Sequence, residues 1–565
     1  MILSYNKILR DMSASTNVIG LLICRCSRDV KSVNYNLLNE YLKNLGTIVS
    51  VFFLEDLCKD PSIIRERLRL FKPQSMLVVG CMEYRDVLIN EIESIGLNPL
   101  LIEFIPHKEL FSEFPRDSKL QATGKLTVMI YSSVEKLKFI EPARRVEPRR
   151  ARASLKISRR SLFRSLPQFL MVYEPTPVVE RDKCIGTTAC SFCMTVCPRR
   201  ALSGSEDGRV LVDVDKCSIC GVCASICPTG AIQIPNATDE QIDAQVKSIL
   251  QNFTGEIPNK IVMFIDPTLY REILEELIKM KASLLLELFP IELPTLGLIS
   301  ENLLLSTIAY GARGVIVPFV LGEDVSEYLD VLRRKTVIAR KILESLGYSN
   351  PPIYLLEFRE LKSFIRNLEN LRNECLKNQF TIKNMCKSYP GDRRTKLISI
   401  VKDFVKDGKI VVDILDYGEP CPFAEVIVDR ELCTLCGLCY EKCPTKSFTL
   451  TKDVDMLHLA FIYQKCLGCN LCASICPEKA ITLKRYFSVS RLLDDNPSIL
   501  ISQELVKCSR CSKPFITKGK LRKLEKIYSG LGVEDTSKLQ SLKLCPECRR
   551  SKIVPAEYDK WFIYR

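Results

Sequence analysis

The feature that most constrains this chain is a short run of cysteines that recurs along it. Three copies read C-x2-C-x2-C-x3-C-P without interruption, at 217–228, 433–444 and 466–477. A looser copy at 184–198 reads C-x5-C-x2-C-x3-C-P. Cysteines at two-residue gaps wind a tight loop whose thiolates converge on one metal cluster, and this run is the ligand pattern of bacterial 4Fe–4S proteins. The sequence therefore predicts iron–sulfur clusters at these segments.

The runs come in two pairs, and the pairing decides which cysteines share a cluster. The fourth cysteine of a run is turned away by the proline and ligates the neighbouring cluster. Each pair then forms one ferredoxin-like 2x[4Fe–4S] module, which gives two modules and four 4Fe–4S clusters. The expected ligand sets are Cys184, Cys190, Cys193 and Cys227; Cys217, Cys220, Cys223 and Cys197; Cys433, Cys436, Cys439 and Cys476; and Cys466, Cys469, Cys472 and Cys443.

Disulfides and zinc are the alternatives for these cysteines. The 27 cysteines would suggest disulfides in a secreted chain, but the first residues lack a secretory signal and cytosolic thiols stay reduced. Zinc sites usually take two CxxC pairs without a third cysteine and a trailing proline. In the looser copy, where residues 185–189 lengthen the first loop, a complete 4Fe–4S cluster is expected, and a cluster that has lost one iron is the alternative.

Two further CxxC pairs lie toward the C-terminus, Cys508 with Cys511 and Cys545 with Cys548. Two pairs without a third cysteine are typical of a tetrahedral, structural Zn²⁺ site. We therefore expect a zinc ribbon at 500–555. A rubredoxin-like iron site is the alternative, although the intervening segment lacks the aromatic core of rubredoxin.

The first part of the chain alternates compact apolar runs with helix-length segments, a rhythm that indicates βαβ units and a parallel sheet. Cys24 and Cys26 end the first expected strand, Cys58 follows the second, and Cys81 ends the third. Because the carboxyl ends of parallel strands share one edge, these thiols are expected to meet there and to hold a fifth 4Fe–4S cluster. Ordinary buried cysteines are the alternative.

A chain of 565 residues is too long for one core. The expected fold class is multidomain α/β plus α+β. The expected order is an N-terminal parallel-sheet α/β domain at 1–140, a basic linker at 141–172, a ferredoxin-like module at 173–238, a middle α/β domain at 250–350, a helical connector at 351–420, a second ferredoxin-like module at 421–487 and the zinc ribbon at 500–555.

The formal net charge of +14 is typical of a nucleic-acid binder. That sum counts cysteines as neutral, whereas four clusters and one Zn(Cys)4 site, each adding about −2, lower it to about +4. The chain also lacks a basic stripe interleaved with aromatic residues. A nucleic-acid partner is therefore not expected. No apolar stretch reaches the roughly 20 residues of a membrane span, so a soluble cytoplasmic protein is expected.

Residues 16–106, from TNVIGLLICRC to LLIEFIP, resemble the N-terminal domain of the heterodisulfide reductase A subunit, the flavoprotein hub of electron-bifurcating complexes. The resemblance includes Cys24, Cys26, Cys58 and Cys81, and it implies that this domain holds a cluster. It also implies partners that carry redox groups, namely flavin- or metal-bearing subunits of heterodisulfide reductase or hydrogenase type.

Residues 260–345, especially ELFPIELPTLGLISENLLLSTIAYGARGVIVPFV, resemble the hydrogenase delta subunit that delivers electrons to that hub. Members of that family carry cysteines for a 2Fe–2S cluster, and this stretch has none. The resemblance therefore implies a packing or docking domain without that cluster.

The flavin domain of the heterodisulfide reductase hub opens with G-x-G-x-x-G, and only the basic linker stands in its expected place here. The sole G-x-G, at 530–532, has Asp535 where the last glycine would be and follows no strand. No FAD or NAD site is therefore expected, and electron bifurcation by this chain alone is not expected.

These observations predict an iron–sulfur electron-transfer subunit that relays single electrons through four or five 4Fe–4S clusters within a heterodisulfide reductase-like complex. No catalytic side chain is expected, because the two histidines, His107 and His458, belong to no motif. The alternatives are a stand-alone oxidoreductase with its site at the N-terminal cysteines, or a polyferredoxin of another redox complex.

Overall fold

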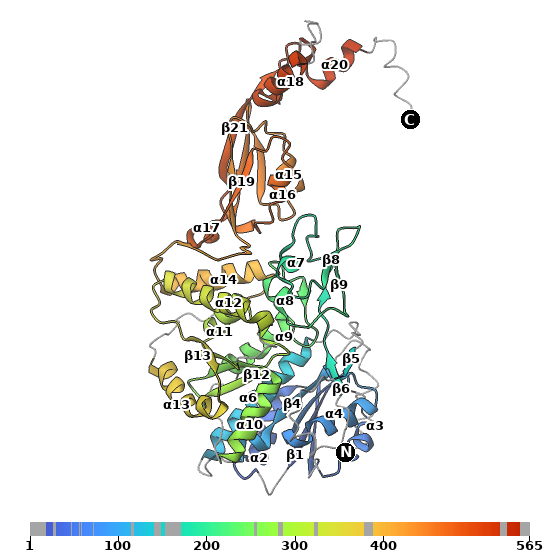
Figure 1. Ribbon diagram of the computed structural model, residues 1–565, viewed down its shortest axis with the longest axis vertical. Helices are drawn as coiled ribbons and strands as arrows, with labels where there is room; N and C mark the ends of the chain where they lie inside the picture. The colour runs from blue at the N-terminus through green and yellow to red at the C-terminus, as the bar shows by residue number, and fades with distance from the viewer. Residues whose placement is uncertain are drawn as a thin grey trace. The chain divides into compact units, whose positions relative to one another are not determined.

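The structure is a computed structural model that divides into two compact units (Figure 1). The first unit is Met1–Cys184 with Phe192–Val411, and the second is Ile185–Ser191 with Val412–Arg565. The described residues are 18–25, 30–46, 48–55, 57, 59–69, 71, 73–112, 114, 118–139, 149–152, 171–252, 257–280, 286–320, 326–377, 388–530 and 540–553. Among the helices of these ranges, none is both long and apolar enough to cross a membrane.

The N-terminal domain of the first unit is built on a four-stranded parallel sheet. Its strands are β1 (Ile19–Arg25), β2 (Val49–Glu55), β3 (Ser75–Gly80) and β4 (Ile102–Pro106), in the spatial order β2-β1-β3-β4. The two central strands are almost entirely apolar and buried, as in sheets that are covered on both faces. The helices are α2 (Tyr35–Leu42), α3 (Ile63–Arg69), α4 (Arg85–Ser94), α5 (His107–Phe111) and α6 (Lys119–Lys138), and α6 packs against β1, β3 and β4.

The middle domain, in the same unit, repeats this topology. Its strands are β11 (Ile261–Ile265), β12 (Leu288–Glu292), β13 (Gly314–Val320) and β14 (Ile353–Phe358), in the order β12-β11-β13-β14 and all parallel. Its helices are α10 (Pro267–Lys279), α11 (Glu301–Ala309), α12 (Ser326–Ser345), α13 (Leu361–Lys377) and α14 (Arg393–Asp407). The expected parallel-sheet α/β domains are confirmed.

Two of the expected segments contain more structure than their names imply. β14 lies within 351–420, the expected helical connector, because it completes the middle sheet by pairing with β13. Within 141–172, the expected basic linker, β5 (Arg149–Arg152) pairs antiparallel with β6 (Met171–Glu174). The rest of that linker, at 141–148 and 153–170, lies outside the described residues.

The first ferredoxin-like module consists of short elements around the first two cysteine runs. They are β7 (Val178–Val179), α7 (Phe192–Val196), β8 (Leu202–Gly204), β9 (Val210–Val212), α8 (Val222–Ile226) and β10 (Ile232–Gln233). β7 pairs with β10, and β8 pairs with β9. The helix α9 (Asp239–Lys247) follows and packs against α6 and α11. Apart from residues 185–191, the module belongs to the same compact unit as the middle domain.

The second unit contains the other ferredoxin-like module and the C-terminal region. The module comprises β16 (Ala424–Val428), α15 (Leu438–Lys442), β17 (Phe448–Lys452), β18 (Met456–Phe461), α16 (Leu471–Ser474) and β19 (Ile481–Arg485), with β16 paired to β19. β17 and β18 continue into β21 (Ser498–Lys507) and β22 (Pro514–Thr517) as one sheet. β15 (Ile414–Leu415) pairs with β20 (Phe487–Ser488), and α17 (Val489–Leu493), α18 (Lys518–Gly530) and α20 (Pro546–Ile553) complete the unit.

Candidate metal centres

The loop that precedes the third cysteine has the same backbone form in all three unbroken runs. The residues immediately before and after the second cysteine have positive φ angles; these are Ile219 and Gly221, Leu435 and Gly437, and Gly468 and Asn470. Such left-handed turns curl the chain so that consecutive backbone N–H groups line a concave surface, a form that binds anions and occurs at many iron–sulfur sites. Isoleucine and leucine adopt positive φ only at a conformational cost, as residues at functional sites often do.

The segment after the fourth cysteine is also the same in every run, the looser one included. The third residue after that cysteine has a positive φ angle, and the next backbone N–H donates to the cysteine sulfur. The four N···S distances are 3.2 Å for Ala201 to Cys197, 3.3 Å for Ala231 to Cys227, 3.4 Å for Ser447 to Cys443 and 3.4 Å for Ala480 to Cys476. Hydrogen bonds to a metal-bound thiolate stabilise its charge, so these backbone contacts fit iron–sulfur ligation.

Two cavities are each lined by cysteines of two different runs. In the first module the lining includes Cys217, Cys220 and Cys223 together with Cys197 from the preceding run. In the second module it includes Cys433, Cys436, Cys439 and, from the following run, Cys476. In both cavities the fourth cysteine comes from the neighbouring run. The residues present therefore fit a four-thiolate cluster at each cavity.

The remaining thiols of the second module are also close together. Burial raises the pKa of Cys472 well above its ordinary value, and the charges of Cys466, Cys469, Cys439 and Cys443 raise it further. Burial and repulsion from neighbouring thiolates likewise raise the pKa of Cys439 to about 12. Closely packed thiols of this kind become thiolates at neutral pH only when a cation offsets their charge, which is what a metal cluster supplies.

In the looser run, the first two cysteines make backbone hydrogen bonds to residues nearby in the sequence. The backbone N–H of Cys184 donates to the Glu180 carbonyl at 3.1 Å, and that of Cys190 donates to the Gly186 carbonyl at 2.9 Å. The set of Cys184, Cys190, Cys193 and Cys227 stays a prediction, because residues 185–191 group with the second unit.

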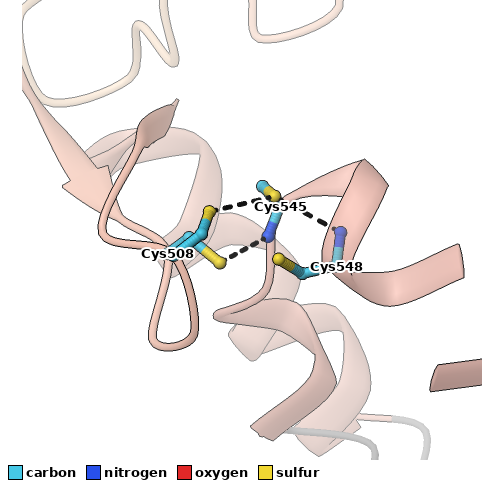
Figure 2. Close-up of side chains that lie close together, drawn as sticks. Cys508, Cys545 and Cys548 are labelled. Atoms are coloured by element: carbon cyan, nitrogen blue, oxygen red, sulfur yellow. Dashed lines mark hydrogen bonds between the residues drawn. The ribbon is translucent and has the colours of Figure 1, made fainter. Parts of the chain in front are cut away.

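The four C-terminal cysteines meet at one point (Figure 2). The sulfurs of Cys508, Cys511, Cys545 and Cys548 all lie within 4.8 Å of one another. The Cys545 N–H donates to the Cys508 sulfur at 3.3 Å and is the main reason why the pKa of Cys508 is lowered. The Cys548 N–H donates to the Cys545 sulfur at 3.4 Å. Four convergent thiols with amide donors can hold a tetrahedral metal ion.

The N-terminal cysteines are described only in part. Cys24 on β1 and Cys81 directly after β3 are both buried at the carboxyl edge of the sheet. Cys26 and Cys58 lie outside the described residues. His107 follows β4 at the same edge, where its Nδ1 lies 2.9 Å from the Gly80 carbonyl oxygen and burial lowers its pKa to about 4. The fifth cluster stays a prediction.

The other histidine, His458, lies on β18 between two polar partners. Its Nδ1 is 2.7 Å from the Ser502 hydroxyl, and its Nε2 is 3.0 Å from an Asp453 carboxylate oxygen. The contact with Ser502 joins β18 to β21, and the contact with Asp453 joins β18 to the turn before it.

Several residues around the first module escape sequence reasoning. The Thr295 hydroxyl donates to the Cys220 carbonyl at 3.0 Å, and Gly297 lies against the same carbonyl. Arg393 reaches the segment of Cys227 from α14. No spacing or motif marks these residues, because they come from the middle domain and contact backbone atoms.

Known proteins match both modules. A 4Fe–4S dicluster domain family matches residues 173–231, and another 4Fe–4S dicluster domain family matches residues 426–483. An uncharacterised ferredoxin of Methanocaldococcus jannaschii is 43% identical over 70 residues, which are 11% of this chain and 87% of that protein. The iron–sulfur A subunit of CoB–CoM heterodisulfide reductase from the same organism is 38% identical over an alignment of 286 residues that covers 42% of each chain. The chain belongs to the 4Fe–4S ferredoxin family and is similar to the A subunits of heterodisulfide reductases.

An iron–sulfur A subunit of CoB–CoM heterodisulfide reductase from Methanopyrus kandleri is similar to this ferredoxin-family chain at 25% identity over 283 residues, again 42% of each chain. The chain therefore spans less than half the length of the heterodisulfide reductase relatives that it matches. The expected resemblance to these relatives is confirmed, as is the presence of 4Fe–4S dicluster domains. The resemblance of residues 260–345 to the hydrogenase delta subunit stays a prediction.

Proposed function

We propose that this chain is an electron-transfer subunit that relays single electrons through four 4Fe–4S clusters in its two ferredoxin modules. One observation supports the proposal most directly. Two cavities are each lined by three cysteines of one run together with the fourth cysteine of the neighbouring run. A 4Fe–4S cluster, when bound, takes up and releases one electron at a time. Crossed ligation places two clusters of a module next to each other, which is the arrangement that a relay needs.

The protein residues around each cavity hold the cluster and set its environment. The N–H donors to Cys197 and Cys476 offset thiolate charge, which favours the reduced, more negative state. Apolar lining residues such as Leu202 and Leu459 cover part of each cavity. In the second module, Cys436 is exposed and gives the cavity an open side through which a redox partner could exchange electrons.

Cysteines outside the ferredoxin modules support two further metal sites. We propose that Cys508, Cys511, Cys545 and Cys548 hold a structural Zn²⁺, with a rubredoxin-like iron as the alternative. We also propose a fifth 4Fe–4S cluster at the carboxyl edge of the N-terminal sheet, where Cys24 and Cys81 are buried.

The proposed partners are other redox subunits of a heterodisulfide reductase-like complex, which carry a flavin or a metal centre. The support is the similarity to proteins whose names describe iron–sulfur subunits of heterodisulfide reductase. The sequence offers no G-x-G-x-x-G after a strand, so the flavin is proposed to reside on a partner.

A coulometric titration of anaerobically purified protein tests the relay. The chain is expected to take up about one electron per cluster, hence about four from the ferredoxin modules. Cys436→Ala is expected to lower the uptake by about one electron, because it removes a ligand from one cavity. Cys375→Ala is the matched control, since Cys375 is buried against Gly314 in the middle domain and lies in no cysteine run. Equal uptake by Cys436→Ala and the wild type would contradict the proposal.

A further inference from the structure

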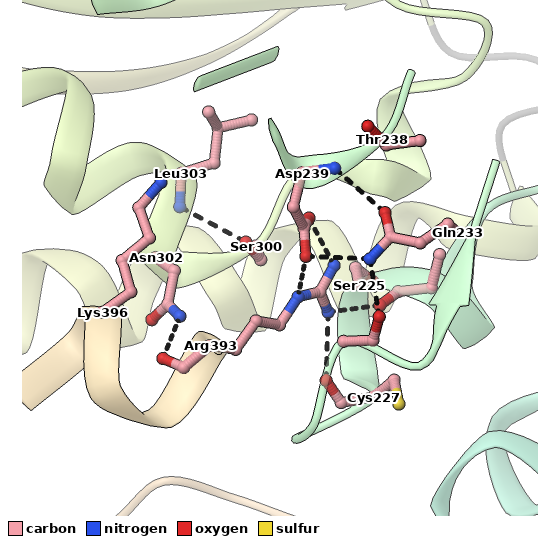
Figure 3. Close-up of polar contacts among 12 residues, drawn as sticks. Ser225, Cys227, Gln233, Thr238, Asp239, Ser300, Asn302, Leu303, Arg393 and Lys396 are labelled. Carbon is pink, nitrogen blue, oxygen red and sulfur yellow. Dashed lines mark hydrogen bonds and ion pairs between the residues drawn. The ribbon is translucent and has the colours of Figure 1, made fainter. Parts of the chain in front are cut away.

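A guanidinium from the middle domain reaches the backbone of the first module beside Cys227 (Figure 3). Arg393 is the first residue of α14, and its Nη1 donates to the Cys227 carbonyl at 3.1 Å and also to the Ala224 carbonyl. These partners lie 166 and 169 positions away in the sequence. The arginine therefore binds the turn that carries the fourth cysteine of a run. The cysteine pattern does not predict this contact.

Asp239 holds the guanidinium in this position. Arg393 donates through Nε to Oδ2 of Asp239 at 2.6 Å and through Nη2 to Oδ1 at 2.7 Å, a bidentate pair with a fixed geometry. The Asp239 N–H in turn donates to the Gln233 side chain at 2.9 Å. The Gln233 amide donates to the Gly230 carbonyl at 2.6 Å, so the network closes on the same turn.

The turn itself leaves little room between these groups. Gly230 has φ of +67°, and a Cβ there would lie 3.2 Å from the Asp239 carboxylate and 3.4 Å from the Arg393 side chain. The Ala231 N–H after this glycine donates to the Cys227 sulfur. Arg393 and Asp239 thus pack against the residues that orient the hydrogen bond to the Cys227 sulfur.

The arginine of this pair is buried and the aspartate is half-buried, and their charges act at short range. The Arg393 side chain is 10% exposed. Burial alone would raise the pKa of Asp239, but the Arg393 guanidinium holds it below its ordinary value. The Nη1 atom of Arg393 lies 3.1 Å from the Cys227 carbonyl oxygen, which places the cation beside this residue. Charges in a site of low dielectric interact strongly with one another.

We propose that Arg393 is a positioning residue that raises the reduction potential of the cluster ligated through Cys227, with Asp239 limiting that effect. The proposal rests on the proposed function, because it assumes a 4Fe–4S cluster at Cys227. Adding an electron makes the cluster and its thiolates more negative. A cation held beside one ligand stabilises the reduced state, and an anion beside it has the opposite effect.

Substitution of the two partners is expected to shift one midpoint potential in opposite directions. Arg393→Gln removes the cation and leaves the Asp239 carboxylate, so the potential should become more negative. Asp239→Asn keeps the arginine and removes the anion, so the potential should become less negative. Arg393→Lys retains the charge but not the bidentate geometry and should give a smaller shift than Arg393→Gln. Arg333→Gln is the control, since Arg333 pairs with Glu357 at 3.1 Å on the exposed side of the middle domain.

The measurement is an anaerobic redox titration with dithionite as electron donor, followed by electron paramagnetic resonance, with iron counted in each variant. Opposite shifts in a single cluster, and none in Arg333→Gln, support the proposal. Unchanged potentials, or shifts of the same sign in Arg393→Gln and Asp239→Asn at full iron content, overturn it. If Arg393→Gln loses iron, the midpoint potential of Asp239→Asn decides between the outcomes. A less negative potential supports the proposal, and an unchanged or more negative potential overturns it. Wild-type protein without 4Fe–4S signals would instead contradict the proposed function.

Discussion

Cys476, the fourth cysteine of the last run, lines the same cavity as Cys433, the first cysteine of the run before it. The two residues lie on opposite sides of the β17–β18 hairpin in the sequence. Their meeting is the crossed arrangement in which each run completes the cluster of its neighbour. Under the proposed function, the two halves of the module would depend on each other for their clusters.

Crossed ligation predicts how pairs of cysteine substitutions combine. Cys433→Ala with Cys476→Ala removes two ligands of one expected set, so the double variant should lose about four iron atoms relative to wild type. Cys433→Ala with Cys466→Ala removes one ligand from each of two sets and should lose about eight. Iron analysis of the purified variants distinguishes the two. Equal losses in both would contradict the crossed assignment.

Replacing Gly297 should loosen the first module from the middle domain. A Cβ on Gly297 would lie 1.9 Å from the Cys220 carbonyl oxygen, so Gly297→Ala must displace backbone. Overpacking of this kind typically lowers the free energy of unfolding by ~1–3 kcal/mol. Gly530→Ala is the control, because no atom of the described residues lies within 4 Å of the added Cβ. Thermal unfolding of both variants measures the effect, and equal midpoints would count against this contact.

Lys125 should make stability depend on pH. It lies on α6, fully buried, with its Nζ 5.5 Å from the centre of the Phe289 ring, and burial lowers its pKa to about 7. Between pH 7 and the ordinary lysine pKa of about 10.4, the unfolded chain binds more protons than the folded one, so stability rises with pH through this window. Lys125→Met should therefore be more stable than wild type at pH 7, by ~2 kcal/mol, with an advantage that shrinks toward pH 10.

The check is chemical unfolding at pH 7, 8.5 and 10 under anaerobic conditions. Lys119→Met serves as the control, since Lys119 is exposed at the start of the same helix. A difference between Lys125→Met and wild type that stays constant with pH would refute the prediction.

Removal of one C-terminal cysteine should release a single metal ion. Cys511→Ser takes one of four thiols from the site near α18 and α20, and we expect the loss of about one zinc per chain with the iron content unchanged. Hydrogen exchange in α20 should rise, because Cys545 and Cys548 are then no longer held to Cys508. Loss of iron in place of zinc would favour the rubredoxin-like alternative.

The structure shows which features can be predicted from the sequence and which cannot. The runs themselves, the parallel sheets and the grouping of Cys508 with Cys545 follow from spacing and from apolar periodicity, which are local signals. The positive φ angles at Ile219 and Leu435 do not follow, because neither residue type favours that conformation. In this conformation the Leu435 N–H donates to the Cys433 sulfur at 3.5 Å, a contact that no residue preference reveals.

Contacts between residues far apart in the sequence also cannot be predicted from it. Arg393 and Asp239 are 154 positions apart and belong to no motif, so only the packing of the middle domain against the module brings them together. β14 is not predicted from the sequence because IYLLEF is a short apolar run within a stretch of charged helices. Short runs of this kind are ambiguous between strand and helix until their neighbours are known.

The central claim is that sixteen thiolates hold four 4Fe–4S clusters, and iron and acid-labile sulfide counts on anaerobically purified protein, with electron paramagnetic resonance of the reduced state, test it most directly. We expect at least about sixteen iron and sixteen sulfide per chain, with signals of reduced 4Fe–4S clusters that interact in pairs. Far fewer iron atoms per chain, together with no such signal after reduction, would contradict the account.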